Sequence, residues 1–181
     1  MYGKPVNRLR ASRLRDDGGA RDTVAMNEPV QPDPSALAEA YRNARYGVSL
    51  DGDRFDLRVG ARTRDLEAYW PAARYVLLTA WNPRSLPQPA EANRLADDLL
   101  RERLRQAGVL HARAWASAED GAWHEDGWLL GEIAFDEAHA LAREFGQAGV
   151  LAWTRGEPVR LHMLLPRPPH APPADWTEWV E

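Results

Sequence analysis

The side chains best placed to bind a ligand follow a buried apolar run. Residues 75–81, Tyr-Val-Leu-Leu-Thr-Ala-Trp, stop at Asn82-Pro83, and a proline-rich loop leads into a helical pattern from about Glu91. Pro83 disfavours the helical conformation at Asn82, and an amide side chain both donates and accepts hydrogen bonds. The sequence therefore predicts a site for a polar small molecule or peptide at the Asn82 loop. The residues expected to converge there are Thr79, Asn82, Ser85 and Asn93.

A ligand contact and a purely structural role remain open for these residues. The free N–H groups of the following helix would favour an anion, although Glu91 would oppose a strongly charged one. Alternatively, Asn82 and Ser85 satisfy only the loop backbone and cap the helix. Gln147, which follows a helix-ending glycine, could likewise reach the ligand or close the turn.

An acidic pair beside a histidine suggests a second kind of chemistry. Glu125 joins the predicted ligand-binding residues, and His124 with Glu125 and Asp126 could also serve acid–base catalysis or hold a hard metal ion. A solvated turn explains the same residues. The alternative function is thus a hydrolase or transferase that uses Glu125 or Glu132 with His124 and Asn82. Glu132 is expected in mid-strand, where burial would require a partner such as Arg103, Arg113 or Gln147.

Several established classes of site lack their sequence signals. The chain contains no cysteine, no HExxH, no GxGxxG, no GxxxxGK[ST] and no GxSxG. We therefore expect no metal and no cofactor. Since no nucleophile is evident, a regulatory or accessory role is preferred over catalysis.

Alternating and helical patterns predict the elements that must position these residues. The expected strands are 74–81, 109–117, 127–134, 149–154 and 159–164, and the expected helices are 91–107 and 136–145, with a loop over 118–126. The order from 74 to 154 is β-α-β-β-α-β, the ferredoxin-like order. Ahead of it lie a helix from Ser35 and a hairpin around Asp51-Gly52-Asp53. The fold class is therefore α+β, with a mixed sheet and helices mainly on one face.

The 91–107 helix carries the best-formed apolar stripe. Its expected inward residues are Ala92, Leu95, Ala96, Leu99, Leu100 and Ala107. Asn93 falls on the edge of this stripe, so it should point partly inward.

Composition divides the chain into three parts. Residues 1–34 are expected to be a disordered extension, 35–165 a single domain and 166–181 a Pro/Trp-rich tail. The extension is either a basic arm or a segment upstream of a start at Met26. Trp176 and Trp179 either fold back onto the domain or make the tail an adaptor for a protein partner.

The net charge and the hydropathy of the chain indicate which classes of partner to expect. The net charge is −4, whereas nucleic-acid binders usually present a basic face, so no nucleic acid is expected. No apolar run is long enough to cross a bilayer, so no membrane is expected either. The absence of cysteine fits a cytoplasmic location.

Four short motifs resemble an uncharacterised bacterial family, domain of unknown function 3293. They are Leu57-Arg58-Val59-Gly60, Thr79-Ala80-Trp81-Asn82-Pro83-Arg84-Ser85, Glu91-Ala92-Asn93 and Phe145-Gly146-Gln147-Ala148. Residues 123–130, with a Trp, an acidic pair and an apolar run, are similar to a further segment of that family. The resemblance covers about residues 40–164 and implies family membership without a known activity.

Overall fold

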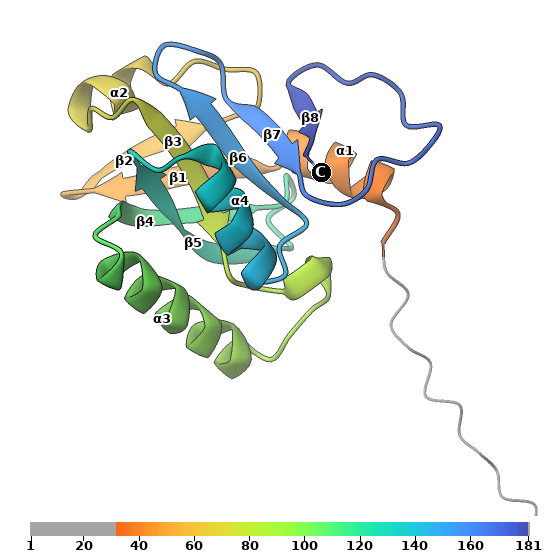
Figure 1. The fold of residues 1–181 in the computed structure, drawn as a ribbon, viewed down its shortest axis with the longest axis horizontal. Coiled ribbons are helices and arrows are strands. Elements are labelled where there is room, and N and C mark those ends of the chain that lie inside the picture. The colour runs from red at the N-terminus through yellow and green to blue at the C-terminus, as the bar shows by residue number, and fades with distance from the viewer. Residues whose placement is uncertain (1–31, 181) are drawn as a thin grey trace, which may run out of the picture.

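Within residues 32–180, a curled sheet of eight strands organises the fold (Figure 1). The computed structural model describes residues 32–180. The strand order is β2-β1-β4-β5-β3-β6-β7-β8, and every neighbouring pair is antiparallel except β7 and β8, which are parallel. The expectation of an α+β fold with a mixed sheet is confirmed.

The elements follow the predicted order closely. The strands are β1 (Arg45–Leu50), β2 (Asp53–Leu57), β3 (Arg74–Thr79), β4 (Leu110–Ser117), β5 (His124–Gly131), β6 (Gly149–Thr154), β7 (Arg160–Met163) and β8 (Thr177–Trp179). The α-helices are α1 (Pro34–Asn43), α2 (Arg64–Tyr69), α3 (Ala90–Gln106) and α4 (Phe135–Glu144), and a short 3₁₀ helix, η1, spans Pro83–Ser85. Asp33, rather than Ser35, caps α1 by accepting from the Ser35 amide.

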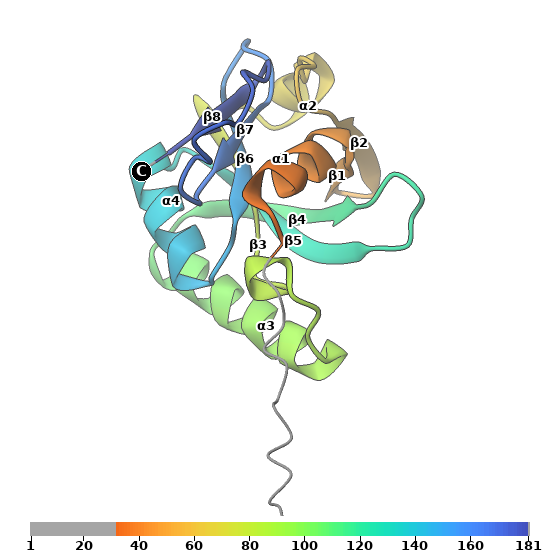
Figure 2. The same cartoon turned by 90° about the vertical axis from the view of Figure 1, so that its right-hand side faces the viewer.

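Helices cover both faces of the sheet, not mainly one face as the sequence predicts. Tyr75 and Leu77 of β3 belong to a core cluster that includes residues of α1 and α2. Val76 and Leu78 alternate to the opposite face and join a cluster with residues of α3 and α4. Figure 2 shows α1 on one side of the curled sheet and α3 and α4 on the other. Burial on both faces explains why β3 reads as a continuous apolar run.

The predicted hairpin forms β1 and β2. Leu50 pairs with Asp53 across a loop of Asp51 and Gly52, whose φ angles are 50° and 94°. Positive φ at both loop residues matches the twist of the flanking strands, and Gly52 adopts it without steric cost.

Helix α3 is turned about its axis relative to the predicted stripe. Its buried residues are Asn93, Asp97, Leu100 and Leu104. Leu95 and Leu99, expected in the core, are 62% and 55% exposed. The rotation is possible because Asn93 and Asp97 find hydrogen-bond partners on the sheet side, which removes the cost of burying them.

Strand β5 begins and ends earlier than expected. Residues 124–126 belong to the strand, not to a loop, and pair with 115–117 of β4. Glu132 lies beyond the end of β5 with φ 60°, so the prediction of a mid-strand residue is wrong. It is exposed, and its carboxylate accepts from the Ala73 amide at 2.7 Å rather than from Arg103, Arg113 or Gln147.

The C-terminal segment returns to the sheet edge. Thr177–Trp179 forms β8, paired with Leu161–Met163 of β7. Trp176 lies against Gly60, and the Arg160 guanidinium lies 5.4 Å from the centroid of the Trp176 ring. Trp176 nevertheless remains 40% exposed.

The two predictions for the N-terminus concern residues that the structure does not describe. The predicted extension, 1–34, and the alternative start at Met26 lie almost entirely outside residues 32–180. Within 32–180, no helix combines the length and the apolar character that a membrane span needs.

Candidate functional site

The loop after β3 is held in a conformation that few residues adopt. Asn82, Arg84 and Ser85 have φ angles of 46°, 57° and 57°, all in the left-handed region. Asparagine tolerates this region better than most side chains, whereas arginine and serine must be held there. The Arg84 amide accordingly donates to the Gly146 carbonyl at 2.7 Å, which ties the loop to the end of α4.

Asn82 and Asn93 fix the loop to α3. The Asn82 amide N–H donates to Asn93 Oδ1 at 2.9 Å, and Asn93 Nδ2 donates back to Asn82 Oδ1 at 2.9 Å. Asn82 Oδ1 also accepts from the Gln88 amide at 2.9 Å. Both side chains are buried, at 8% and 4% exposure. Their amide groups are therefore largely consumed within the protein.

The remaining donor of Asn82 reaches across to β5. Its Nδ2 donates to Glu125 Oε1 at 2.9 Å, and Trp123 Nε1 donates to the same oxygen at 2.8 Å. Burial raises the pKa of Glu125, an effect that the hydrogen bonds from Asn82 and Trp123 oppose. The loop thus orients a half-buried carboxylate.

Glu125 forms part of the wall of a cavity of about 310 Å³ between α1 and the sheet. Its apolar wall includes Leu37, Leu77, Leu151 and Leu161. The lining residues with polar side chains are Tyr41, Tyr46, Thr79, Ser85, Ser117, Glu125 and Gln147. A mostly apolar hollow with a few polar groups is the usual form of a small-molecule site.

The structure divides the predicted site residues into two groups. Thr79, Ser85, Glu125 and Gln147 line the cavity. Asn82 and Asn93 do not line it; Asn82 donates to Glu125, and Asn93 is hydrogen-bonded to Asn82. Ligand contact at any of the six remains a prediction.

Two tyrosines, Tyr41 of α1 and Tyr46 of β1, line the cavity. The Tyr41 hydroxyl is hydrogen-bonded to Ser85 Oγ, and the Tyr46 hydroxyl donates to the Tyr41 carbonyl at 2.8 Å. Burial raises the pKa of Tyr41 to about 12 and also raises that of Tyr46. Both side chains therefore stay neutral near pH 7.

The side-chain donors of Thr79 and Gln147 form hydrogen bonds within the protein. Thr79 Oγ1 donates to the Asp126 carbonyl at 2.8 Å and accepts from the Trp81 amide at 3.0 Å. Gln147 Nε2 donates to the Trp81 carbonyl at 3.0 Å. Within residues 32–180, no hydrogen bond reaches Gln147 Oε1 or Glu125 Oε2. The groups left for a ligand are thus mainly acceptors.

The alternative acid–base set does not meet at one point. His124 contacts Asp126 at 3.5 Å on the α3 face of β5, whereas Glu125 alternates to the cavity face. Glu132 lies past the other end of the same strand. A hydrolase or transferase that uses Glu125 or Glu132 with His124 therefore loses its geometric basis, although Asn82 does contact Glu125.

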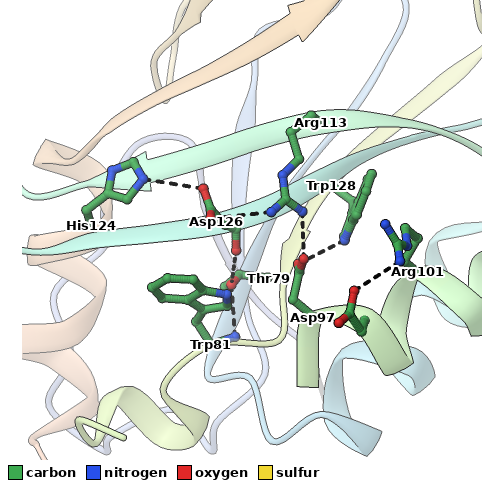
Figure 3. Close-up of polar contacts among 9 residues, drawn as sticks. Thr79, Trp81, Asp97, Arg101, Arg113, His124, Asp126 and Trp128 are labelled. Atoms are coloured by element: carbon green, nitrogen blue, oxygen red, sulfur yellow. Dashed lines mark hydrogen bonds and ion pairs between the residues drawn. The ribbon is translucent and has the colours of Figure 1, made fainter. Parts of the chain in front are cut away.

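A second polar cluster lies on the α3 face of β4 and β5 (Figure 3). Arg113 bridges Asp97 at 2.7 Å and Asp126 at 3.3 Å, and its guanidinium lies 4.6 Å from the Trp128 ring centroid. Trp128 Nε1 donates to the other oxygen of Asp97 at 3.0 Å. Asp97 is thus satisfied on both oxygens, and the cluster joins α3 to the sheet.

A groove of about 470 Å³ adjoins this cluster. Its lining residues are Trp81, Arg94, Asp97, Asp98, Arg101, Arg113, Asp126 and Trp128. The formal charges of its arginines and aspartates cancel, and Arg101 is paired with Asp98 at 3.0 Å. The groove therefore offers no net charge to attract an ion. Among residues 32–180, no group of three or more metal-binding side chains comes together.

Part of the chain matches the model of a known protein family. Residues 78–150 match the family model described as Protein of unknown function (DUF3293). The resemblance read from the sequence motifs is thereby confirmed over residues 78–150, whereas the motif Leu57-Arg58-Val59-Gly60 lies outside the matched segment. The DUF3293 segment contains all six predicted site residues. No match was found among curated proteins or among solved structures.

Sequence reasoning missed three residues of the site. Tyr41 and Tyr46 lie outside the DUF3293 segment and read as ordinary members of apolar patterns in a helix and a strand. Trp123 lies inside the segment but has no predicted role. The available signal was chemical, because buried Tyr and Trp usually need a hydrogen-bond partner.

Proposed function

We propose that this protein binds a small amphipathic amine in the cavity beside the Asn82 loop, as an accessory or regulatory domain. The apolar part of the ligand fills the space between α1 and the sheet. Its ammonium group donates to Glu125 Oε2, and Gln147 Oε1 accepts a further hydrogen bond. The ligand is therefore less polar than the sequence suggests, with its polarity confined to one end.

The observation that carries this proposal is the state of Glu125. One carboxylate oxygen is occupied by two donors, Asn82 and Trp123, while the other receives no hydrogen bond from residues 32–180. A half-buried carboxylate gains most from a ligand that brings both a donor and a positive charge. An alcohol would supply only the donor, and a carboxylic acid would bring a like charge.

Support for an accessory role comes from the hydroxyl groups. The Ser85 hydroxyl is hydrogen-bonded to the Tyr41 hydroxyl. Because its pKa is raised, Tyr41 is a poor general base near pH 7. Among residues 32–180, neither His111, His124, His139, His162 nor His170 lines the cavity. No histidine among these residues is thus available as a general base for Ser85, which favours binding over covalent catalysis.

Three probes of similar size test the proposal. Phenethylamine, phenethyl alcohol and 3-phenylpropionate are each titrated into the ¹⁵N-labelled protein at pH 7.5, and amide shifts are followed. Phenethylamine should bind best and 3-phenylpropionate worst, with the largest shifts at Leu77, Thr79 and Glu125. Equal shifts for all three probes, or shifts confined to other regions, would reject the proposal.

Two finer expectations accompany it. We propose a ferredoxin-like core over β3 to β6, an idea supported by the order β4-β5-β3-β6 and the antiparallel pairing of these strands. We also propose a cytoplasmic location, supported by the absence of cysteine. A protein partner that contacts the exposed part of Trp176, or Trp179, stays a prediction.

A further inference from the structure

Two buried histidines connect helix α4 to the edge of the sheet. His139 of α4 and His162 of β7 are 4% and 5% exposed. His139 Nε2 and His162 Nδ1 are 2.9 Å apart. On the other side of the ring, His162 Nε2 lies 3.5 Å from Glu178 Oε2 of β8. Helix, inner strand and edge strand thus share one chain of polar contacts.

The contacts determine where the hydrogens lie. A neutral imidazole has one N–H and one lone pair. His139 Nδ1 is buried and has no hydrogen-bond partner among residues 32–180, so a hydrogen on Nδ1 would leave an unsatisfied N–H, and the hydrogen lies on Nε2. His139 therefore donates from Nε2 to His162 Nδ1, and His162 carries its own hydrogen on Nε2, which lies 3.5 Å from Glu178 Oε2.

We propose that these contacts from α4 through His162 to Glu178 form an acid-sensitive latch. The latch holds β8 against the sheet while both histidines are neutral and releases β8 when one of them is protonated. The vacant position for a proton is His139 Nδ1, which is buried and has no hydrogen-bond partner within the described part of the chain. Charging either ring within the closed structure would leave a buried N–H without a partner. The protonated pair is accommodated only when the contact between α4, β7 and β8 opens.

Neighbouring charged residues both lower and raise the pKa values of the two histidines. Burial is the main cause that lowers the pKa of His139; Arg143 lowers it further, while Asp136 and Glu178 raise it. Burial also lowers the pKa of His162, which Glu178 raises and His139 and Arg160 lower. Because both values fall below the ordinary 6.5, the histidines favour the closed form above about pH 6.5 and weaken it as the pH falls.

Strand β8 is the element that gives way. It has three residues, lies at the sheet edge and follows the proline-rich segment 166–175. Its backbone links include Leu161 N–H to the Trp176 carbonyl at 2.8 Å and Val180 N–H to the Met163 carbonyl at 2.9 Å. The Arg160–Glu178 pair and the bond from Arg143 to the Val180 carbonyl add exposed contacts only.

Amide hydrogen exchange of the full chain tests the latch. The protection factors of the Leu161 and Val180 amides should fall by up to about tenfold per pH unit between pH 6.5 and 5. Amides of the β3–β5 ladder should keep their protection. Unchanged protection at Leu161 and Val180, or a uniform loss throughout the protein, would overturn the proposal.

Variants separate the histidines from other acid effects. The double variant His139→Gln with His162→Gln should flatten the pH dependence, whereas His124→Gln, which removes an exposed histidine, should leave it unchanged. Persistence of the dependence in the double variant would contradict the latch. The imidazole ¹⁵N spectrum of the wild-type protein at pH 8 tests the assignment of the hydrogens without any variant. Both rings should carry their hydrogen on Nε2. A hydrogen on His139 Nδ1 would refute the assignment.

Discussion

Asn82 Nδ2 donates to Glu125 Oε1 across 2.9 Å, which links the loop after β3 to the carboxylate in the cavity wall. The same asparagine exchanges two hydrogen bonds with Asn93 of α3. Asn82 is therefore a positioning residue, and its loss should affect both the loop and the cavity.

Replacement of Asn82 should separate its side-chain role from its backbone role. Asn82→Ala should lower the free energy of unfolding by roughly 2–4 kcal/mol, because several buried groups lose partners. Asn82→Gly loses the same bonds but adopts φ 46° freely, so it should be about 1 kcal/mol more stable than the alanine variant. Chemical denaturation measures both, and an alanine variant as stable as the glycine one would disagree with this assignment.

Stability against pH should reveal the environment of Glu125. Burial raises its pKa above the ordinary 4.5, so the folded state binds more protons there than the unfolded state. Its contribution to stability therefore falls as the pH rises from 4.5 through the folded-state pKa, and is constant above that value.

Glu125→Gln removes this titration while it keeps an oxygen for Asn82 and Trp123. The stability of the variant relative to wild type should thus increase with pH from 4.5 and then level off. Thermal unfolding from pH 4.5 to 8 measures the difference. Glu119→Gln, an exposed substitution on the same hairpin, is the control. A difference for Glu125→Gln that does not change with pH would count against a raised pKa.

The sequence was informative where the pattern and the chemistry agreed. The run 75–81 and the segment Asp51-Gly52-Asp53 predicted β3 and the first hairpin, because continuous burial and positive φ leave clear signals; β3 ends at Thr79, two residues before the expected end of the strand. The loop after β3 was also identified, since Pro83 ends the strand pattern. Four of the six predicted site residues line the cavity that this loop adjoins, whereas Asn82 and Asn93 do not.

Tertiary contacts decided what the sequence could not predict. Leu95 and Leu99 read as core because nothing in the sequence tells that Asn93 and Asp97 have buried partners across the chain. Glu132 read as mid-strand because its bond to the Ala73 amide comes from a distant loop. The roles of Tyr41 and Tyr46 likewise depend on how α1 packs over the sheet.

The two aspartates of α3 should differ sharply in their effect on stability. Asp97→Ala should cost about 2–3 kcal/mol, because Arg113 and the Trp128 N–H lose a buried partner. Asp98→Ala, on the next residue, breaks only an exposed pair with Arg101 and should cost no more than about 0.5 kcal/mol. Urea denaturation compares the two, and equal costs would show that the cluster does not anchor α3.

Filling the cavity should abolish binding without removal of a polar group. Ala116 of β4 lines the cavity and is small. Ala116→Leu should displace phenethylamine while the free energy of unfolding changes by less than about 1.5 kcal/mol, because the added methyl groups occupy open space. Titration calorimetry and thermal unfolding measure the two effects. Full retention of binding in a folded variant would place the probe elsewhere.

The affinity of phenethylamine for wild type and for Glu125→Gln, measured by calorimetry at pH 7.5, tests the central claim most directly. Loss of a charge-assisted hydrogen bond should raise Kd by about 10- to 100-fold. An equal Kd for the two proteins would show that Glu125 does not recognise the amine.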